Sequence, residues 1–290
     1  MDSVNKIGVI GAGQMGRGIA QVAAAVGCEV VLLDASMELA ERGKASLAAS
    51  LQRRVDRDKM TAADAEAIVA RLHPSGDYAS LADADVVVEA ATENFDTKCK
   101  IFRAADAAMK DGAILASNTS SISLTKLAAE TGRPDRVIGM HFMNPVPVMK
   151  LIEVIRAMQT SEDTYETVMS LGERMGKVLV TTKDMPGFIV NRLLIPFLNE
   201  ACFALQEGLG TPEDIDTAIK LGLNHPMGPF ELADLIGVDT VLYIAEVLFR
   251  EIGEDKYRPA VLLRNYVAAG WLGRKSGRGF FEYDERGKRK

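Results

Sequence analysis

The sequence predicts an α/β fold in which a domain built on a mostly parallel sheet is followed by an all-helical domain. Short apolar runs alternate with helix-length segments through the first half, which is typical of parallel strands joined by helices. The continuous run Val86-Val87-Val88 indicates a strand buried on both faces. Beyond Asp184-Met185-Pro186-Gly187 the segments are long and helical in pattern, so we expect domains at residues 1–184 and 185–290.

Composition sets limits on the class of protein. The 290 residues are enough for about two domains. With 34 Lys and Arg against 40 Asp and Glu, the formal charge is −6, which argues against nucleic acid or an anionic membrane as the main partner. The three cysteines have no C-x-x-C spacing, so we expect neither disulfides nor a metal site. The chain has no signal-type start and no apolar run of membrane-spanning length, so a soluble, cytoplasmic protein is expected.

The first elements in the chain are a strand, a glycine turn, a helix and a second strand. Residues 6–10 are a short apolar run, and the Ala-rich stretch at 17–26 is helical and ends at Gly27. Residues 29–33 are apolar again and end at Asp34, which predicts a second buried strand. Together these segments predict a βαβ unit at the start of the sheet.

The segment between residues 36 and 84 is mainly helical in pattern. A long helix is expected at 36–57, and Thr61-Ala62-Ala63-Asp64 is a capping box that begins a short helix. That helix stops before His73-Pro74, where His73 is expected in a loop or a cap. The segment shows no clear third strand, so the strand order of the sheet stays open.

The remaining elements follow from apolar periodicity and from start and stop signals. Four more strands are expected, at 85–90, 113–117, 136–142 and 150–156. Two more helices of the first domain are expected at 95–109 and 123–129. The second domain is expected to contain helices at 188–206, 212–221, 240–252 and 259–268. Thr211-Pro212-Glu213-Asp214 marks one of their starts clearly, because it places Pro and two acids in the first turn.

A G-x-G-x-x-G sequence follows the first strand and begins the first helix. In such a unit Gly11 permits a tight turn, Gly13 lets the backbone approach a pyrophosphate, and Gly16 lets helix and strand pack closely. Asp34 would accept hydrogen bonds from the adenosine ribose and repel a 2′-phosphate, which favours NAD over NADP. FAD binding, or glycines that serve only a turn, are the alternatives. The pattern predicts a Rossmann-type dinucleotide-binding domain.

Polar residues lie at or just beyond the carboxyl ends of three predicted strands, where ligands gather in open α/β sheets. They are Glu93, residues 118–121 and His141. Glu153 lies in the next strand and would approach His141 if residues 144–149 turn the chain back. Such a pair suits removal of a hydroxyl proton during hydride transfer. A core histidine beside a solvated strand carboxylate is equally compatible with the spacing.

Several longer motifs resemble the 3-hydroxyacyl-CoA dehydrogenase family, most closely its bacterial 3-hydroxybutyryl-CoA dehydrogenases, over nearly the whole chain. These motifs are Gly11-Ala12-Gly13-Gln14-Met15-Gly16, Ser117-Asn118-Thr119-Ser120-Ser121, residues 139–153 with His141, Asn144 and Glu153, Pro186-Gly187-Phe188-Ile189-Val190-Asn191-Arg192 and Gly273-Arg274-Lys275-Ser276-Gly277. The resemblance implies NAD-dependent, reversible oxidation of (S)-3-hydroxyacyl-CoA, with short chains expected, and a homodimer formed through the helical domain.

The resemblance also implies roles for individual residues. His141 would be the general acid and base, Glu153 its orienting partner, and Ser120 and Asn191 hydrogen-bond donors near the C3 oxygen of the substrate. NAD would contact residues of the glycine turn and six others, which are Gly11, Gly13, Gln14, Met15, Gly16, Asp34, Glu93, Lys98, Ser120, Asn144 and Lys275. Lys98 and Ser120 would also contact coenzyme A.

One stretch departs from the family, whose members often carry more uniformly basic residues at 53–59. Asp56 and Asp58 interrupt it here, but Arg54 and Arg57 remain candidate partners for the 3′-phosphate of coenzyme A. A solvated helix face explains these arginines equally well. Two other functions stay open: a dehydrogenase of a small hydroxy acid without coenzyme A, and a non-catalytic NAD-binding protein.

Overall fold

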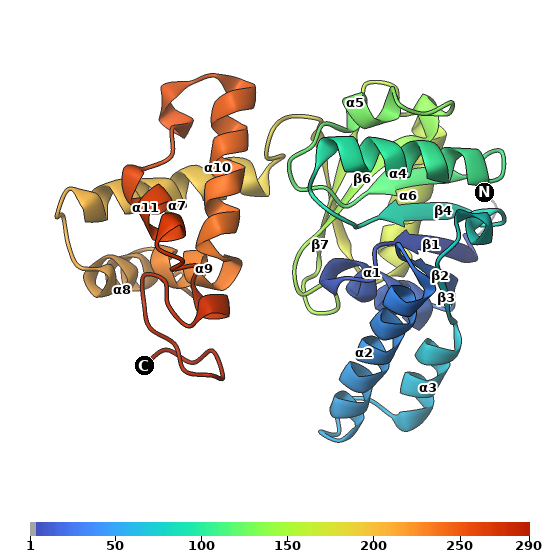
Figure 1. The fold of residues 1–290 in the computed structure, drawn as a ribbon, viewed down its shortest axis with the longest axis horizontal. Coiled ribbons are helices and arrows are strands. Elements are labelled where there is room, and N and C mark those ends of the chain that lie inside the picture. Colours follow the sequence, from blue (N-terminus) through green and yellow to red (C-terminus); the bar gives the residue numbers. More distant parts are fainter. Residues whose placement is uncertain (1–3) are drawn as a thin grey trace. The chain divides into compact units, whose positions relative to one another are not determined.

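We describe a computed structural model of the chain, which covers residues 4–290; residues 1–3 of the predicted first domain lie outside the described residues. The chain divides into two compact units, one that ends at Met185 and a second that comprises Pro186–Lys290. Each unit has its own apolar core, and the two are described separately (Figure 1).

Within residues 4–290 the first unit contains an eight-stranded sheet with the order β3-β2-β1-β4-β5-β6-β7-β8. All neighbouring strands are parallel except β6 and β7, which pair antiparallel, so the predicted mostly parallel sheet is confirmed. The strands are β1 Lys6–Ile10, β2 Glu29–Leu33, β3 Leu72–Ser75, β4 Val86–Glu89, β5 Ile114–Ser117, β6 Val137–Phe142, β7 Leu151–Arg156 and β8 Val178–Lys183.

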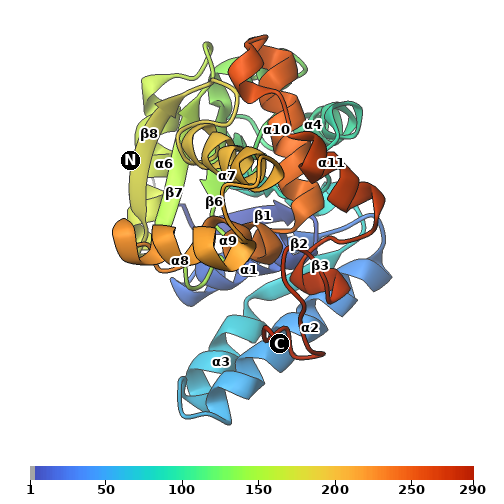
Figure 2. The ribbon, with the colours of Figure 1, turned by 90° about the vertical axis from the view of Figure 1, so that its left-hand side faces the viewer.

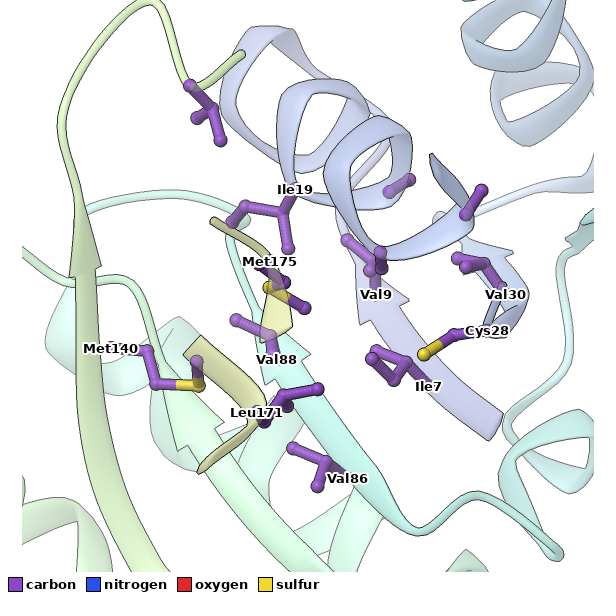
Figure 3. Close-up of a cluster of buried hydrophobic side chains, with 14 of the residues drawn as sticks. Ile7, Val9, Ile19, Cys28, Val30, Val86, Val88, Met140, Leu171 and Met175 are labelled. Atoms are coloured by element: carbon purple, nitrogen blue, oxygen red, sulfur yellow. The ribbon is translucent and has the colours of Figure 1, made fainter. Parts of the chain in front are cut away.

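Helices cover both faces of this sheet. They are α1 Gln14–Ala25, α2 Met37–Val55, α3 Ala62–Ala70, α4 Phe95–Ala108, α5 Leu124–Ala128 and α6 Glu162–Arg174. Ile19 of α1 and Leu171 of α6 pack on one face, against Val9, Val88 and Met140 (Figure 3). Because side chains alternate along a strand, the intervening residues of β4 and β5 point to the other face, where α4 contacts β5. Both faces are buried, which explains the uninterrupted valines of β4.

The strand β3 is an element that the sequence did not reveal. Leu72-His73-Pro74-Ser75 is short and contains proline, which argues against a strand within a sheet. β3 lies at the edge beside β2, where a missing backbone N–H is tolerated. His73 is therefore in a strand rather than in the expected loop or cap, and its Nε2 lies 2.6 Å from Glu29 Oε2 at the surface.

Two further elements of the first unit, α6 and β8, were not expected from the sequence. The side chain of Ser161 caps α6 by accepting a hydrogen bond from the Thr164 N–H at 3.2 Å. β8 extends the sheet beyond β7 as an exposed edge strand. The expected helix at 36–57 corresponds to α2, which lies beside α3 (Figure 1 and Figure 2).

The second unit is helical, as predicted. Its helices are α7 Val190–Gln206, α8 Pro212–Gly222, α9 Pro229–Ile236, α10 Val238–Ile252 and α11 Val261–Ala268. Short 3-10 segments occur in both units, at Tyr78–Leu81, Pro134–Arg136, Asp255–Tyr257 and Arg274–Ser276. In the part of the chain that the structure describes, no helix is both long and apolar enough to span a membrane.

The helix α9 was missed because a distant residue stabilises its start. The buried carboxylate of Asp216, in α8, accepts hydrogen bonds from the N–H groups of Phe230 and Glu231 at 2.8 and 2.9 Å. Near the other end of α9, Asp234 accepts hydrogen bonds from Phe280 N, Phe281 N and the Tyr283 hydroxyl. Burial raises the pKa of both carboxyl groups. Such long-range caps leave no local signal in the sequence.

Candidate active site

The glycine turn has the geometry that its sequence predicts. Gly11 has φ +104°, and a Cβ there would lie 2.7 Å from Ala90 O. A Cβ on Gly16 would lie 1.7 Å from Gly11 O, so only glycine permits this contact between helix and turn. A Cβ on Gly13 would meet no atom of residues 4–290 within 4 Å. The backbone at Gly13 is therefore open to a ligand.

The start of α1 provides the other features that a dinucleotide needs. Gly13 is the N-cap residue and, within the described chain, no side chain caps this helix, so its first N–H groups and positive dipole end suit a pyrophosphate. Asp34 follows β2, and its Oδ2 accepts a hydrogen bond from Ala12 N at 2.7 Å. The carboxylate thus lies beside the turn, with lone pairs remaining for ribose hydroxyls. These residues fit a dinucleotide.

The glycines allow a paired test of this site. Gly16→Ala is expected to lower the free energy of unfolding by about 3 kcal/mol or more, because the methyl group overlaps a backbone oxygen. Gly13→Ala is expected to change it by about 1 kcal/mol or less while raising the Kd for NADH at least about 10-fold. Urea denaturation and NADH fluorescence titration measure the two effects. Unchanged NADH affinity in Gly13→Ala would contradict this assignment of the turn.

His141 and Glu153 are brought together by the antiparallel pairing of β6 and β7, in which they are direct partners. Glu153 Oε2 lies 2.7 Å from His141 Nδ1. Glu153 is fully buried and His141 is 6% exposed, so the carboxylate has little access to water and the contact with the imidazole is strengthened. The carboxylate fixes the ring so that a proton sits on Nδ1 and Nε2 is left for chemistry.

The loop at residues 144–149 makes this approach possible by turning the chain back. It contains a cis peptide bond between Asn144 and Pro145. Lys177 holds the loop, since its Nζ donates hydrogen bonds to Val146 O at 2.5 Å and Met149 O at 2.8 Å, and burial lowers the pKa of this lysine. The predicted approach of Glu153 to His141 is therefore present in the structure.

The segment after β5 brings Ser120 to the other side of the imidazole. Ser120 Oγ lies 3.1 Å from His141 Nε2. Asn118 helps to place the two strands, because its side-chain oxygen accepts a hydrogen bond from Phe142 N at 2.8 Å. The resulting order of contacts is carboxylate, imidazole and hydroxyl, which is an arrangement that can accept a proton from a substrate hydroxyl and return it.

Glu93 organises the turn that carries Ser120. Its Oε1 accepts four hydrogen bonds, which come from Thr119 Oγ1 at 2.6 Å, Ser120 N at 2.8 Å, Ser121 N at 3.1 Å and Ser121 Oγ at 3.0 Å. Its side chain is 30% exposed, so the residue is accessible to a ligand as well. The carboxylate was expected to contact NAD, and the structure adds this contact with the turn.

Lys98 has surroundings that differ from those expected of a ligand-binding lysine. Its side chain is 2% exposed and its Nζ lies 2.6 Å from Oε2 of the fully buried Glu89. Glu89 was missed in the sequence, although an acid that ends the apolar strand Val86–Glu89 would need a buried partner. The lysine nine residues later in α4 is that partner.

The other predicted site residues lie in three places. Gln14 Nε2 donates a hydrogen bond to Asn144 Oδ1 at 2.9 Å, which joins the glycine turn to the 144–149 loop. Met15 packs against the core of the first unit. Asn191, buried in α7, and Lys275, whose Nζ lies 2.6 Å from Asp239 Oδ1, belong to the second unit.

A groove of about 370 Å³ lies between α1, α2 and the 144–149 loop. Arg54 lines it, whereas Arg57 follows the end of α2 and is exposed. Arg17 and Arg53 also line the groove, and neither was among the predicted binding residues. Arg54 therefore lies at the groove, whereas Arg57 is not among its lining residues. The sequence does not show this difference.

Both parts of the chain match the models of one known family. The model of the 3-hydroxyacyl-CoA dehydrogenase NAD binding domain matches residues 6–185, and that of the C-terminal domain matches 187–283. The chain is 51% identical to a probable 3-hydroxybutyryl-CoA dehydrogenase of Bacillus subtilis, over 98% of this chain and 99% of the relative. It is 49% identical to a 3-hydroxybutyryl-CoA dehydrogenase of Bradyrhizobium diazoefficiens, over 97% and 96% of the two chains.

A solved structure shows the same fold over both units. The (S)-3-hydroxybutyryl-CoA dehydrogenase of Ralstonia eutropha is 52% identical, has a TM-score of 0.94 and covers 98% of this chain and 100% of its own. The match to an NAD binding domain confirms NAD as the cofactor that the glycine turn and Asp34 predict. Since both domain models and full-length relatives agree, the chain belongs to the 3-hydroxyacyl-CoA dehydrogenase family.

Proposed function

We propose that this protein oxidises (S)-3-hydroxybutyryl-CoA, and other short-chain 3-hydroxyacyl-CoA esters, to the 3-oxoacyl-CoA, and catalyses the reverse reaction. The observation that carries the proposal is the line of contacts from Glu153 through His141 to Ser120, at the sheet edge where the glycine turn also lies. The substrate class is supported by the names of the similar dehydrogenases.

Each residue has a defined part in the proposed reaction. His141 Nε2 takes the proton from the C3 hydroxyl of the substrate while Glu153 stabilises the imidazolium that forms. Ser120 and Asn191 donate hydrogen bonds to the C3 oxygen, which polarises the carbonyl in the reducing direction. When bound, NAD supplies the acceptor for the hydride that leaves C3. In reduction the imidazolium returns the proton to the C3 oxygen.

The proposed contacts of NAD are those that the glycine turn and the family resemblance imply. Gly11, Gly13, Gln14, Met15 and Gly16 would surround the pyrophosphate, and Asp34 would accept hydrogen bonds from the adenosine ribose. Glu93, Ser120, Asn144 and Lys275 would be further contacts of NAD, as the family resemblance implies. A homodimer formed through the helical unit remains a prediction that the resemblance implies.

The experiment that tests the function follows NADH absorbance with acetoacetyl-CoA as substrate. The proposal expects turnover with NADH, much slower turnover with NADPH because Asp34 repels the 2′-phosphate, and little turnover of free acetoacetate. Equal activity on free acetoacetate would indicate a dehydrogenase that does not need coenzyme A. Tight NADH binding without turnover of either substrate would indicate a non-catalytic binding protein.

Because Arg54 lines the groove beside α2 and Arg57 does not, we expect only Arg54 to contribute strongly to substrate binding. Arg54→Ala is expected to raise the KM for acetoacetyl-CoA about 10-fold, since a charge-assisted hydrogen bond to the 3′-phosphate is lost, with a smaller effect for Arg57→Ala. The KM for acetoacetyl-pantetheine, which lacks that phosphate, should not change. Arg42→Ala, an exposed position on the same helix, is the control. Equal effects on both thioesters would rule out phosphate recognition by Arg54.

A further inference from the structure

A buried ion pair lies beneath the turn that carries Ser120. Glu89 ends β4 and is fully buried, and its carboxylate accepts four hydrogen bonds: two from Lys98 Nζ, at 2.6 and 2.8 Å, one from Ser117 Oγ at 2.7 Å and one from Ala91 N at 2.8 Å. The side chain of Glu89 therefore joins the carboxyl ends of β4 and β5 to the first turns of α4. The family resemblance implies ligand contacts for Lys98 alone and gives no role to the pair.

The pair is connected to the reacting groups through Glu93. Lys98 Nζ lies 3.6 Å from Glu93 Oε2, while Glu93 Oε1 holds the backbone N–H groups of Ser120 and Ser121. Lys98 is thus placed between two carboxylates, one of which holds the segment whose hydroxyl contacts His141. Contacts therefore connect Glu89 to the imidazole of His141 without a gap, through Lys98, Glu93 and Ser120.

The placement of Lys98 does not suit a lysine that binds a phosphate. Its side chain is 2% exposed, and the two oxygens of Glu89 accept hydrogen bonds from two of its three N–H donors at short distances. Exchanging a buried carboxylate partner for a ligand phosphate would leave Glu89 charged and unpaired in an apolar strand, which is strongly unfavourable.

We propose that Lys98, held by Glu89, is a positioning residue that fixes Glu93 and through it the Ser120 turn, and that it does not bind the phosphates of NAD or coenzyme A. The inference rests on the proposed function for the role of Ser120, but the placement of the turn can be measured without turnover. Glu89 and Lys98 act as one unit, so loss of either partner releases the same turn.

The test compares Glu89→Gln, Lys98→Met and the double variant with Lys100→Met, a control at an exposed position on the same helix. The proposal expects kcat with acetoacetyl-CoA to fall about 10- to 100-fold in each single variant, since the Ser120 hydroxyl is displaced. Any rise in the KM or in the Kd for NADH should be equal in the two single variants, because both release the turn that carries the proposed contacts Glu93 and Ser120. The double variant should be no worse than Lys98→Met. Lys100→Met should match the unmodified protein.

Hydrogen exchange provides the measurement that does not depend on activity. The amides of Ser120 and Ser121 should exchange faster in Glu89→Gln and Lys98→Met than in the unmodified protein, while core amides of β1 stay protected. If Lys98→Met does not fold, the exchange rates of Ser120 and Ser121 in Glu89→Gln and in the double variant, which lacks both charges, test whether the pair places the turn. If the unmodified protein has no turnover, the proposed function fails, yet the exchange rates still test the placement of the turn.

Two results would overturn the inference. One is a Lys98→Met variant in which the Kd for NADH or the KM rises about 10-fold while Glu89→Gln is normal, since Lys98 would then contact a ligand directly. The other is a set of folded variants with normal kcat and unchanged exchange at Ser120 and Ser121, which would leave the pair with no effect on the turn.

Discussion

Replacement of His141 by alanine is expected to lower kcat about 10²- to 10⁴-fold, because the reaction loses the group that exchanges a proton with the C3 oxygen. The Kd for NADH should be unchanged, since the features that would hold the pyrophosphate and the adenosine ribose are the start of α1 and Asp34. Stopped-flow or steady-state assays with acetoacetyl-CoA, together with NADH fluorescence titration, measure both quantities.

His73 provides a matched control for this variant. It is also a histidine beside a glutamate, with Nε2 2.6 Å from Glu29 Oε2, but the pair lies on the surface with 55% and 52% of the two side chains exposed. His73→Ala should therefore retain normal turnover. Near-normal turnover in His141→Ala would show that another group transfers the proton and would refute the proposed mechanism.

Glu153→Gln is expected to lower kcat about 10²-fold or more with a much smaller change in KM. An amide cannot offer the imidazolium a negative charge, and its NH₂ group can turn toward Nδ1 and favour the wrong tautomer. Because Glu153 is fully buried beside His141, water cannot replace the missing charge. Steady-state kinetics separate the two parameters, and thermal unfolding checks that the fold is kept.

Glu29→Gln is the control for this second variant, because it changes the equivalent carboxylate of the surface pair. Its turnover should equal that of the unmodified protein. A Glu153→Gln variant that changed only KM would show that the carboxylate contributes to substrate binding and does not orient the imidazole.

Much of the fold was predictable because its signals are local. The apolar runs of β1, β2 and β4, the glycine turn and the cap of α2 by Ser36 each depend on residues close together in the chain. Among the elements that were missed, α6 has local start signals that were overlooked, namely the cap Ser161 and two acids in the first turn. β3 and α9 depend on distant partners. β3 is a proline-containing edge strand stabilised by β2, and the start of α9 is capped by a carboxylate from α8.

The residues of the candidate site also fall into two groups, those that local motifs indicated and those that only the three-dimensional structure revealed. Motif and chemistry pointed to Gly13, Asp34, His141, Glu153 and Ser120 from the sequence. In the structure Asp34 lies beside the glycine turn, and Glu153, His141 and Ser120 form one line of contacts, while their roles stay predictions. Glu89 was missed because its importance follows from complete burial, which sequence position alone does not give. Arg54 and Arg57 could not be distinguished until the path of α2 was known.

Local sequence was therefore sufficient for the class of domain and for the dinucleotide turn, because each depends on residue type and short spacing. For His141 and Glu153 the spacing alone left a core role as an alternative. Packing in three dimensions was needed to establish that Lys98 is enclosed between Glu89 and Glu93. The physical reason is that a charged side chain takes its role from its dielectric surroundings and its partners, and those are set by segments that meet only when the sheet has formed.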